Sequence, residues 1–312
     1  MNRCPLTYEL CGERKYSIRG LKLLSPKLTD LEDFQYTKDE QIEQAAMHAS
    51  KISIQGIQPK LSVRLDIAKR RFDIVDRRGT FIVKPPHLIY PEMVENEDVS
   101  MRLAAAADID VPVHGMIYAR DGSLSYIIRR FDRFGHGQKL AVEDFAQLSG
   151  HSRDTKYNSS MEQVAAVIDR FCTFPQLEKL KLFRLTIFSF LVGNEDLHLK
   201  NFSLLVKDNK VGLSPAYDLV NSSIVFQAKE QMALPIMGKK ANLSRSILFD
   251  YYGAQRLKLP QSAVAKEDAR FQHILPRFEA ILNESFLSAK MRNAYFALLH
   301  ERHSCLFSKV ST

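Results

Sequence analysis

The stretch GNEDLHLKNFSLLV, residues 193–206, places an aspartate, a histidine, a lysine and an asparagine between two apolar runs. The residues that follow, up to SPAYDL, have the alternation of a β-hairpin that turns at residues 208–209. Such a hairpin brings Asp218 back towards Asn201. Because Mg²⁺ takes oxygen ligands from one or two carboxylates and completes its shell with phosphates and water, Asn201 and Asp218 are candidate ligands of one cation beside Asp196.

Asp196 and Asn201 have the D-x-x-x-x-N spacing of the protein-kinase catalytic loop. In that loop the aspartate accepts the proton of the attacking hydroxyl, and the asparagine binds magnesium. A lone match to this spacing arises easily by chance, and Asp218 could instead cap a turn. The prediction of phosphate transfer therefore depends on what precedes the loop.

Residues 52–86 alternate apolar and polar positions between turn signals, which predicts three strands of an antiparallel meander. Backbone amides near Gly56 could cradle phosphates, since a glycine lets the backbone approach an anion closely. Lys84, in the strand-like run FIVK, would offer its ammonium group to the α- and β-phosphates. The alternatives are that Gly56 is only a turn residue and that Lys84 ends a strand in solvent.

Apolar residues at helical spacing in residues 91–111 predict a helix after the lysine strand. A glutamate of this helix would hold Lys84 in place. Glu97 is the first candidate, and Glu92 and Glu95 are its rivals. Two more strands follow around an Asp-Gly hairpin signal at residues 121–122, which makes five strands in this part of the chain.

The periodicity of the second half is mainly helical, with helices expected at residues 161–171, at 176–192 and in several segments between 243 and 308. Another helix is expected at residues 38–51, with Thr37 as its cap. The fold class is therefore α+β, a two-lobed protein-kinase-like fold with a ligand cleft between the lobes. We expect a sheet-rich N-terminal lobe over residues 1–131 and a helical C-terminal lobe over residues 132–312.

The composition is that of an ordinary globular protein, with 45% hydrophobic and 26% charged residues among 312. Lys+Arg number 44 and Asp+Glu number 36, so the net charge is +8, which suits anionic partners without selecting one. Short basic clusters at residues 69–71, 77–78 and 129–133 are more often solvated faces than binding sites.

The four cysteines are too few and too scattered for a disulfide framework, which agrees with a reducing compartment. No apolar stretch approaches the roughly 20 residues that span a bilayer, and the first residues lack the apolar core of a signal peptide. We expect a cytoplasmic protein with unligated thiols.

Five segments, SIQGIQPKLSV, FIVKPP, IIRRFDR, GNEDLHLKNFS and SPAYDL, resemble the serine/threonine kinase toxins of the HipA family. The resemblance covers residues 53–219. Full-length HipA toxins carry an extra N-terminal subdomain, for which this chain begins too close to the glycine turn. In this respect the chain resembles HipT, the short toxin of HipBST-type tripartite systems, in which a separate small protein resembles the missing piece.

The resemblance implies a role for each matched residue. These roles are Asp196 as catalytic aspartate, Asn201 and Asp218 as magnesium ligands, Lys84 as phosphate-binding lysine, Arg129 to Phe131 as the hinge along the adenine, and His198 and Tyr217 as lining of the nucleotide pocket.

Ser53 corresponds to the serine that these toxins autophosphorylate. A second serine can stand two positions later in HipT-like sequences, but Gln55 occupies that position here, so Ser53 would act alone. A phosphate at Ser53 would repel the nucleotide phosphates and reduce ATP binding. The alternative is a strand serine without a regulatory role.

The resemblance also implies ATP and Mg²⁺ as cofactors and an aminoacyl-tRNA synthetase as the protein substrate, phosphorylated on a serine to stop translation and growth. The implied partners are a HipB-like DNA-binding antitoxin and a HipS-like small protein, with DNA bound only through the antitoxin complex. The rival functions are a small-molecule kinase of the aminoglycoside or lipid-kinase type, a pseudokinase, and a nucleic-acid binding module.

Overall fold

The computed structural model describes residues 1–48, 59–135, 138–226 and 230–308. The chain forms two compact units. The first contains residues 1–99, 112–139 and 284–287, and the second contains residues 100–111, 140–283 and the described residues from 288 onward. The sequence-based lobe boundary after residue 131 stays a prediction.

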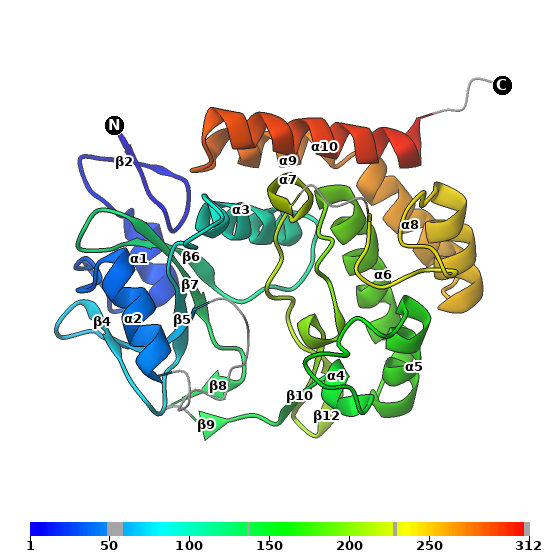
Figure 1. Cartoon of the computed structure of the whole chain (residues 1–312), viewed down its shortest axis with the longest axis horizontal. Coiled ribbons are helices and arrows are strands. Elements are labelled where there is room, and N and C mark those ends of the chain that lie inside the picture. Colours follow the sequence, from blue (N-terminus) through cyan, green and yellow to red (C-terminus); the bar gives the residue numbers. More distant parts are fainter. Residues whose placement is uncertain (49–58, 136–137, 227–229, 309–312) are drawn as a thin grey trace. The chain divides into compact units, whose positions relative to one another are not determined.

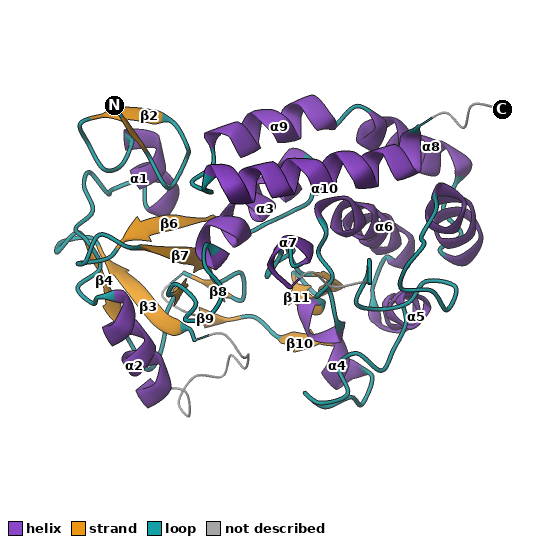
Figure 2. Cartoon of the chain, turned by 45° about the horizontal axis from the view of Figure 1, so that its top comes forward, coloured by secondary structure: helices purple, strands orange, loops and turns teal. Residues whose placement is uncertain are grey.

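A five-stranded antiparallel sheet is the centre of the first unit (Figure 2). Its strands lie in the order β4 (Arg71–Ile74), β3 (Leu61–Asp66), β5 (Phe81–Lys84), β7 (Leu124–Arg129) and β6 (His114–Tyr118). The number of strands and the hairpin between β6 and β7 are those predicted from the sequence.

The predicted meander is wrong, because β5 pairs with β3 and not with β4. The chain leaves the short edge strand β4 and crosses beside β3, where Val75 N donates to Ser62 O at 2.9 Å. Gly79 lies so close to β3 that a Cβ there would come within 2.0 Å of Ser62 Oγ. A glycine at the crossing therefore lets β5 reach the second edge of β3.

The N-terminal residues of the first unit form β1 (Asn2–Arg3), β2 (Leu10–Gly12), α1 (Ile18–Leu24) and α2 (Lys38–His48). Helix α2 starts where it was predicted, in a capping box in which Thr37 N donates to Glu40 Oε2 at 2.8 Å and Glu40 N donates to Thr37 Oγ1 at 3.3 Å. Apolar side chains from this region, including Leu21, Leu28 and Phe34, pack in one core with those of the sheet.

Helix α3 (Met93–Ala106) occupies the segment predicted to be helical, and the division between the units falls within it. Val94, Val99 and Leu103, which carry the helical spacing, are all buried. The first unit continues after β7 with two short strands, β8 (Arg133–Phe134) and β9 (Gln138–Lys139).

The second unit is mainly helical, as predicted. Its long helices are α5 (Met161–Phe171), α6 (Pro175–Val192), a π-helix η2 (Ser246–Arg256), α8 (Gln261–Gln272), α9 (Leu275–Glu284) and α10 (Ala289–Phe307), and its short ones are α4 (Phe145–Leu148), η1 (Leu199–Asn201) and α7 (Ser223–Phe226) (Figure 1). Helix α6 is central, because buried residues such as Leu182, Phe188 and Leu191 lie on all its faces.

A three-stranded antiparallel sheet accompanies these helices, in the order β10 (Val142–Asp144), β11 (Ser203–Lys207) and β12 (Lys210–Leu213). The hairpin β11–β12 is the predicted one. Asp208 and Asn209 both have positive φ, at 49° and 59°, as a two-residue hairpin turn requires. The sequence analysis missed β10, whose three residues are too few to show alternation.

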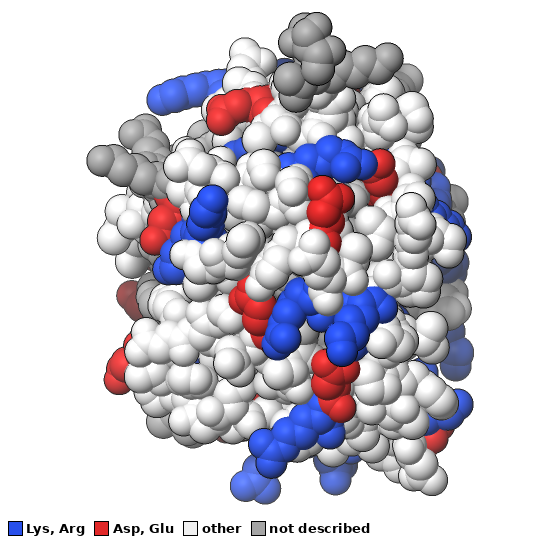
Figure 3. All heavy atoms as spheres, turned by 90° about the vertical axis from the view of Figure 1, so that its right-hand side faces the viewer, with Lys and Arg blue, Asp and Glu red and all other residues white. Residues whose placement is uncertain are grey.

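Charged side chains of both signs are interspersed on the face drawn in Figure 3. Ion pairs such as Arg245 with Asp268, at 2.5 Å, are typical of a solvated surface. Among the described residues, no helix is long and apolar enough to cross a membrane.

Candidate functional site

The loop that carries Asp196 begins where α6 ends. Gly193 caps α6 in the left-handed conformation, with φ at 69°. A Cβ at this position would lie 2.4 Å from Leu298 and 2.7 Å from Ser223 Oγ. Glycine is therefore required both by the backbone conformation and by the packing of the loop.

Asp196 and Asn201 are joined directly within this loop. Asn201 Nδ2 donates to the backbone carbonyl oxygen of Asp196 at 3.0 Å, and the turn η1 between them buries Asn201. The side chain of Asp196 is 45% exposed, so its carboxylate is accessible to a substrate.

Asp218 follows the hairpin in the left-handed conformation, with φ at 60°. Its neighbour Tyr217 donates a hydrogen bond to the carbonyl oxygen of Lys200 at 3.0 Å, and the two hydroxyls of Tyr217 and Ser203 lie 2.6 Å apart. The hairpin thus ties the residue before Asp218 to the residue before Asn201, as the sequence analysis expected.

The residues around Asn201 and Asp218 fit a metal only in part. The described residues contain no cluster of three or more His, Cys, Asp or Glu side chains that could hold an ion. One carboxylate and one amide are the donor set of a Mg²⁺ ion that takes its other ligands from nucleotide phosphates and water. The donor set suits a magnesium–nucleotide complex and not a permanent metal centre.

His198 is buried, and its Nε2 lies 2.7 Å from Lys156 Nζ and 3.9 Å from Asp196 Oδ1. Burial lowers the pKa of His198; the Asp196 carboxylate opposes this shift, and the Lys156 ammonium adds to it. The ring is therefore neutral near pH 7 and accepts a hydrogen bond from Lys156.

Tyr157 was missed by the sequence analysis. Its hydroxyl donates a hydrogen bond to Asp196 Oδ1, and its ring meets the ring of His198 edge-on, with centroids 5.1 Å apart. Burial and the neighbouring Asp196 carboxylate raise the pKa of Tyr157, so the phenol stays a donor. Lys156 and Tyr157 lie about forty residues before the loop in a segment without a recognisable motif, so no signal pointed to them.

Lys84 lies in the first unit and pairs with Glu97, with Nζ and Oε1 2.6 Å apart. Both side chains are buried, at 7% and 5% exposed. Of the three candidate glutamates, the structure thus places Glu97 at the lysine, while burial, Glu92 and Asp98 raise the pKa of Glu95 to about 7. A buried pair between a strand lysine and a helix glutamate is the arrangement that protein kinases use to place the lysine at the phosphates.

The side chain of Arg129, at the start of the predicted hinge, contacts another part of the first unit. Its guanidinium donates to the carbonyl oxygens of Leu23 and Leu24 at 2.9 and 2.6 Å, at the C-terminus of α1, and stacks over the ring of Phe81. Cations stabilise helix C-termini in this way. Phe131, at the other end of the predicted hinge, lies two residues after the end of β7 and is half-buried. The hinge role of residues 129–131 stays a prediction.

Gly56 and Ser53, predicted for phosphate binding and autophosphorylation, lie outside the described residues.

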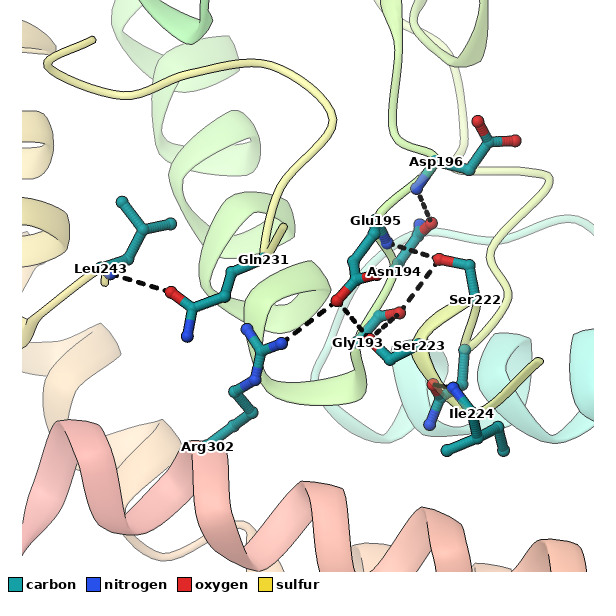
Figure 4. Close-up of polar contacts among 11 residues, drawn as sticks. Gly193, Asn194, Glu195, Asp196, Ser222, Ser223, Ile224, Gln231, Leu243 and Arg302 are labelled. Carbon is teal, nitrogen blue, oxygen red and sulfur yellow. Dashed lines mark hydrogen bonds and ion pairs between the residues drawn. The ribbon is translucent and has the colours of Figure 1, made fainter. Parts of the chain in front are cut away.

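Behind the loop lies a buried polar network that the sequence analysis also missed (Figure 4). Glu195 N donates to Ser222 Oγ at 2.7 Å, and the Ser223 hydroxyl donates to Glu195 Oε1 at 2.5 Å. Arg302 of α10 donates to the same carboxylate oxygen at 3.2 Å. Burial raises the pKa of Glu195, while the hydrogen bond from Ser223 and the Arg302 charge oppose the shift. The residue next to Asp196 is thus held from behind by α7 and α10.

Residues 52–284 match the family model of the HipA-like C-terminal domain. The chain belongs to this family. The match covers the strand lysine, the loop with Asp196 and the hairpin that leads to Asp218.

Relatives of this HipA-like chain include a candidate kinase of Haemophilus influenzae, 28% identical over 87% of each chain. The candidate kinase Y4mE of Sinorhizobium fredii is 32% identical over 64% of this chain and 49% of its own length. The serine/threonine-protein kinase toxin HipA of Shewanella oneidensis is 27% identical over 60% of this chain and 47% of its own length. The alignments thus span about half the length of the last two relatives.

Solved structures show the same fold. The HipA chain of the Shewanella oneidensis complex of HipA, HipB and operator DNA matches with a TM-score of 0.68 and 19% identity, over 89% of this chain and 72% of that chain. The Helicobacter pylori kinase CtkA matches with a TM-score of 0.51 and 16% identity, over 72% of this chain and 86% of that chain. The predicted two-lobed, kinase-like fold class is confirmed.

Proposed function

We propose that this HipA-like protein is an ATP- and Mg²⁺-dependent serine/threonine protein kinase. The observation that carries the proposal is the loop in which Asn201 bonds to Asp196 while the Tyr217 hydroxyl ties the Asp218 end of the hairpin to Lys200. The buried ion pair of Lys84 and Glu97 supports the proposal independently. In protein kinases a strand lysine pairs with a glutamate of the following helix in the same way.

Each of these residues has a separate task in the transfer. The Asp196 carboxylate accepts the proton of the attacking serine hydroxyl and orients it. Asn201 and Asp218 would hold Mg²⁺, and a bound Mg²⁺ would supply positive charge to the phosphates. Lys84, fixed by Glu97, binds the α- and β-phosphates.

We further propose that the protein is a toxin of a toxin–antitoxin system, most similar to HipT. Its substrate would be a serine of a protein, with an aminoacyl-tRNA synthetase as the first candidate, and its action would inhibit translation. Its antitoxin partners would be a HipB-like DNA-binding protein and a HipS-like small protein. The Shewanella HipA structure, which contains HipB and operator DNA, supports this part of the proposal. Autophosphorylation of Ser53 would limit the activity of the kinase itself.

The test is the intact mass of the purified chain before and after incubation with Mg-ATP, with peptide mapping of any added phosphate. The expected result is one phosphate on Ser53 in the wild-type chain and none in D196N. A bacterial lysate labelled with radioactive ATP should show transfer to a protein that the same variant abolishes. Labelled metabolites without any labelled protein would favour the small-molecule kinase instead.

A further inference from the structure

A segment outside the kinase motifs, residues 152–157 between α4 and α5, contacts the catalytic loop at several points. Leu199 N donates to the carbonyl oxygen of Lys156 at 3.3 Å, and the Tyr157 hydroxyl donates to Asp196. The ring of Tyr157 also packs edge-on against His198. Backbone, hydroxyl and ring contacts together fix the position of Lys156 and Tyr157 beside the Asp196 carboxylate.

The Lys156 ammonium group lies next to the predicted reaction centre. Its Nζ is 2.7 Å from His198 Nε2, and that nitrogen is 3.9 Å from the carboxylate oxygen of Asp196. The ammonium also lies 4.9 Å from the centre of the Tyr157 ring. One imidazole nitrogen thus separates a cation from the group that is to accept the substrate proton.

Lys156 makes no ion pair with a carboxylate in the part of the chain that the structure describes. Its side chain is nevertheless half-buried, so that the ammonium group is partly shielded from water. Its described polar partner is the His198 ring, whose Nε2 takes one of the three N–H donors of the ammonium group. Lys200, by contrast, is paired with Asp144 at 2.9 Å. A partly desolvated cation with donors to spare suits an anionic ligand.

We propose that Lys156 is a catalytic residue that contacts the transferred γ-phosphoryl group of ATP, and that Tyr157 holds it in place. This inference rests on the proposed function. In the transfer the serine oxygen forms a bond to the γ-phosphorus and the bond from phosphorus to the β,γ-bridging oxygen breaks. ADP leaves with that electron pair, and the hydroxyl proton passes to Asp196. Lys156 keeps its proton throughout and offsets the negative charge of the phosphoryl oxygens.

The inference predicts that Lys156 distinguishes ATP from ADP, because ADP lacks the group that it contacts. Titration calorimetry with MgCl₂ should compare ADP with the non-hydrolysable β,γ-imido analogue of ATP on the full chain. K156M should bind the ATP analogue about tenfold more weakly than wild type, with ADP binding unchanged. K156R should keep most of the preference. K266M, which removes an exposed lysine of α8, is the matched control and should behave as wild type.

The transfer rate gives a second readout. K156M should lower kcat roughly 10²-fold, the effect typical of removing one group that stabilises transition-state charge. An equal loss of ATP-analogue and ADP affinity in K156M, or no loss of either, would overturn the role of Lys156 while the proposed kinase function stands. A wild-type chain that binds no Mg-ATP would overturn the proposed function itself. If K156M unfolds at the assay temperature, K156Q, which keeps an amide donor for His198 but not the charge, takes its place under the same criteria.

Discussion

Single side chains around Asp196 decide whether its carboxylate is ready to accept a proton. Tyr157 donates to one carboxylate oxygen and leaves the other for the substrate hydroxyl. Y157F removes this donor without removing the ring that packs on His198. We expect a fall in kcat of roughly ten- to a hundredfold, since hydrogen bonds to charged groups are worth about 1.5–3 kcal/mol. Initial rates of transfer from radioactive ATP measure it.

Y251F is the matched control for this substitution, because Tyr251 donates a hydrogen bond to a carboxylate, that of Glu162, at a surface outside the site. It should leave the rate unchanged. A Y157F variant as fast as wild type, with the same thermal midpoint, would show that the contact with Asp196 does not orient the base.

For single residues, the sequence predicted which side chains lie close together where a motif places them at a fixed spacing. Asp196 and Asn201 are close because they share one loop, and Glu97 meets Lys84 because a helix follows the strand. Tyr157 and Arg302 reach the loop only through tertiary packing from segments about 40 and 100 residues away. No local pattern encodes such a contact.

Among the elements, α10 contributes more than apolar packing to the second unit. Its Arg302 is 6% exposed and Glu195 is 4% exposed, and in the described residues two guanidinium nitrogens and one carboxylate oxygen of this pair have no hydrogen-bond partner. R302M should therefore lower the free energy of unfolding by roughly 3–5 kcal/mol, because it leaves a buried carboxylate without its cation. Urea denaturation followed by circular dichroism measures the change.

The double variant R302M/E195M should recover much of the lost unfolding free energy. A buried ion pair with unsatisfied hydrogen bonds stabilises the fold little more than two apolar side chains of the same size do. If the double variant instead lost as much unfolding free energy as R302M and E195M together, that result would contradict a direct coupling between α10 and the loop.

Helix α3 carries a pH dependence in its first turn. The pKa of Glu95 is raised from 4.5 to about 7, by burial first and then by Glu92 and Asp98. The folded state therefore holds a proton that the unfolded chain releases, and stability is lost as pH rises from about 4.5 to 7. E95Q removes this loss, so the urea midpoint of the variant minus that of wild type should increase over this window. The control E143Q, which removes an exposed carboxyl group, should give a flat difference.

Long elements were predictable and short ones were not. The eleven residues of α5 span three turns of apolar periodicity, and the predicted bounds are the observed ones. The three residues of β10 show no period, and they form a strand only because β11 offers an edge. Strand order failed for a similar reason, since alternation predicts strands but not which neighbour each one pairs with.

For the whole molecule, the proposed function predicts stabilisation by ligand. Mg-ATP should raise the thermal midpoint of the full chain because it binds the folded state, by an amount that grows with nucleotide concentration. EDTA should remove most of the shift. D218N should abolish it without unfolding the apoprotein, because asparagine tolerates the left-handed conformation at this position. Differential scanning fluorimetry measures all three, and an equal shift in D218N would contradict a metal role for Asp218.

The fold class of the whole chain could be predicted because the order of strand-rich and helical segments is a coarse property that survives local errors. The lobe boundary after residue 131 stays a prediction, and the first compact unit is not continuous in sequence, since residues 284–287 belong to it. The net charge of +8 predicted little, and on the face shown in Figure 3 basic and acidic side chains are interspersed.

The burial of the thiols makes the molecule suitable for single-site labelling. Cys4, Cys11 and Cys172 are buried, whereas Cys305 is exposed on α10. A maleimide dye should therefore attach at one position without any cysteine being replaced. Because Cys305 lies one helical turn beyond Arg302, the fluorescence of that dye would report, in real time, how α10 responds when nucleotide reaches the loop that Arg302 supports.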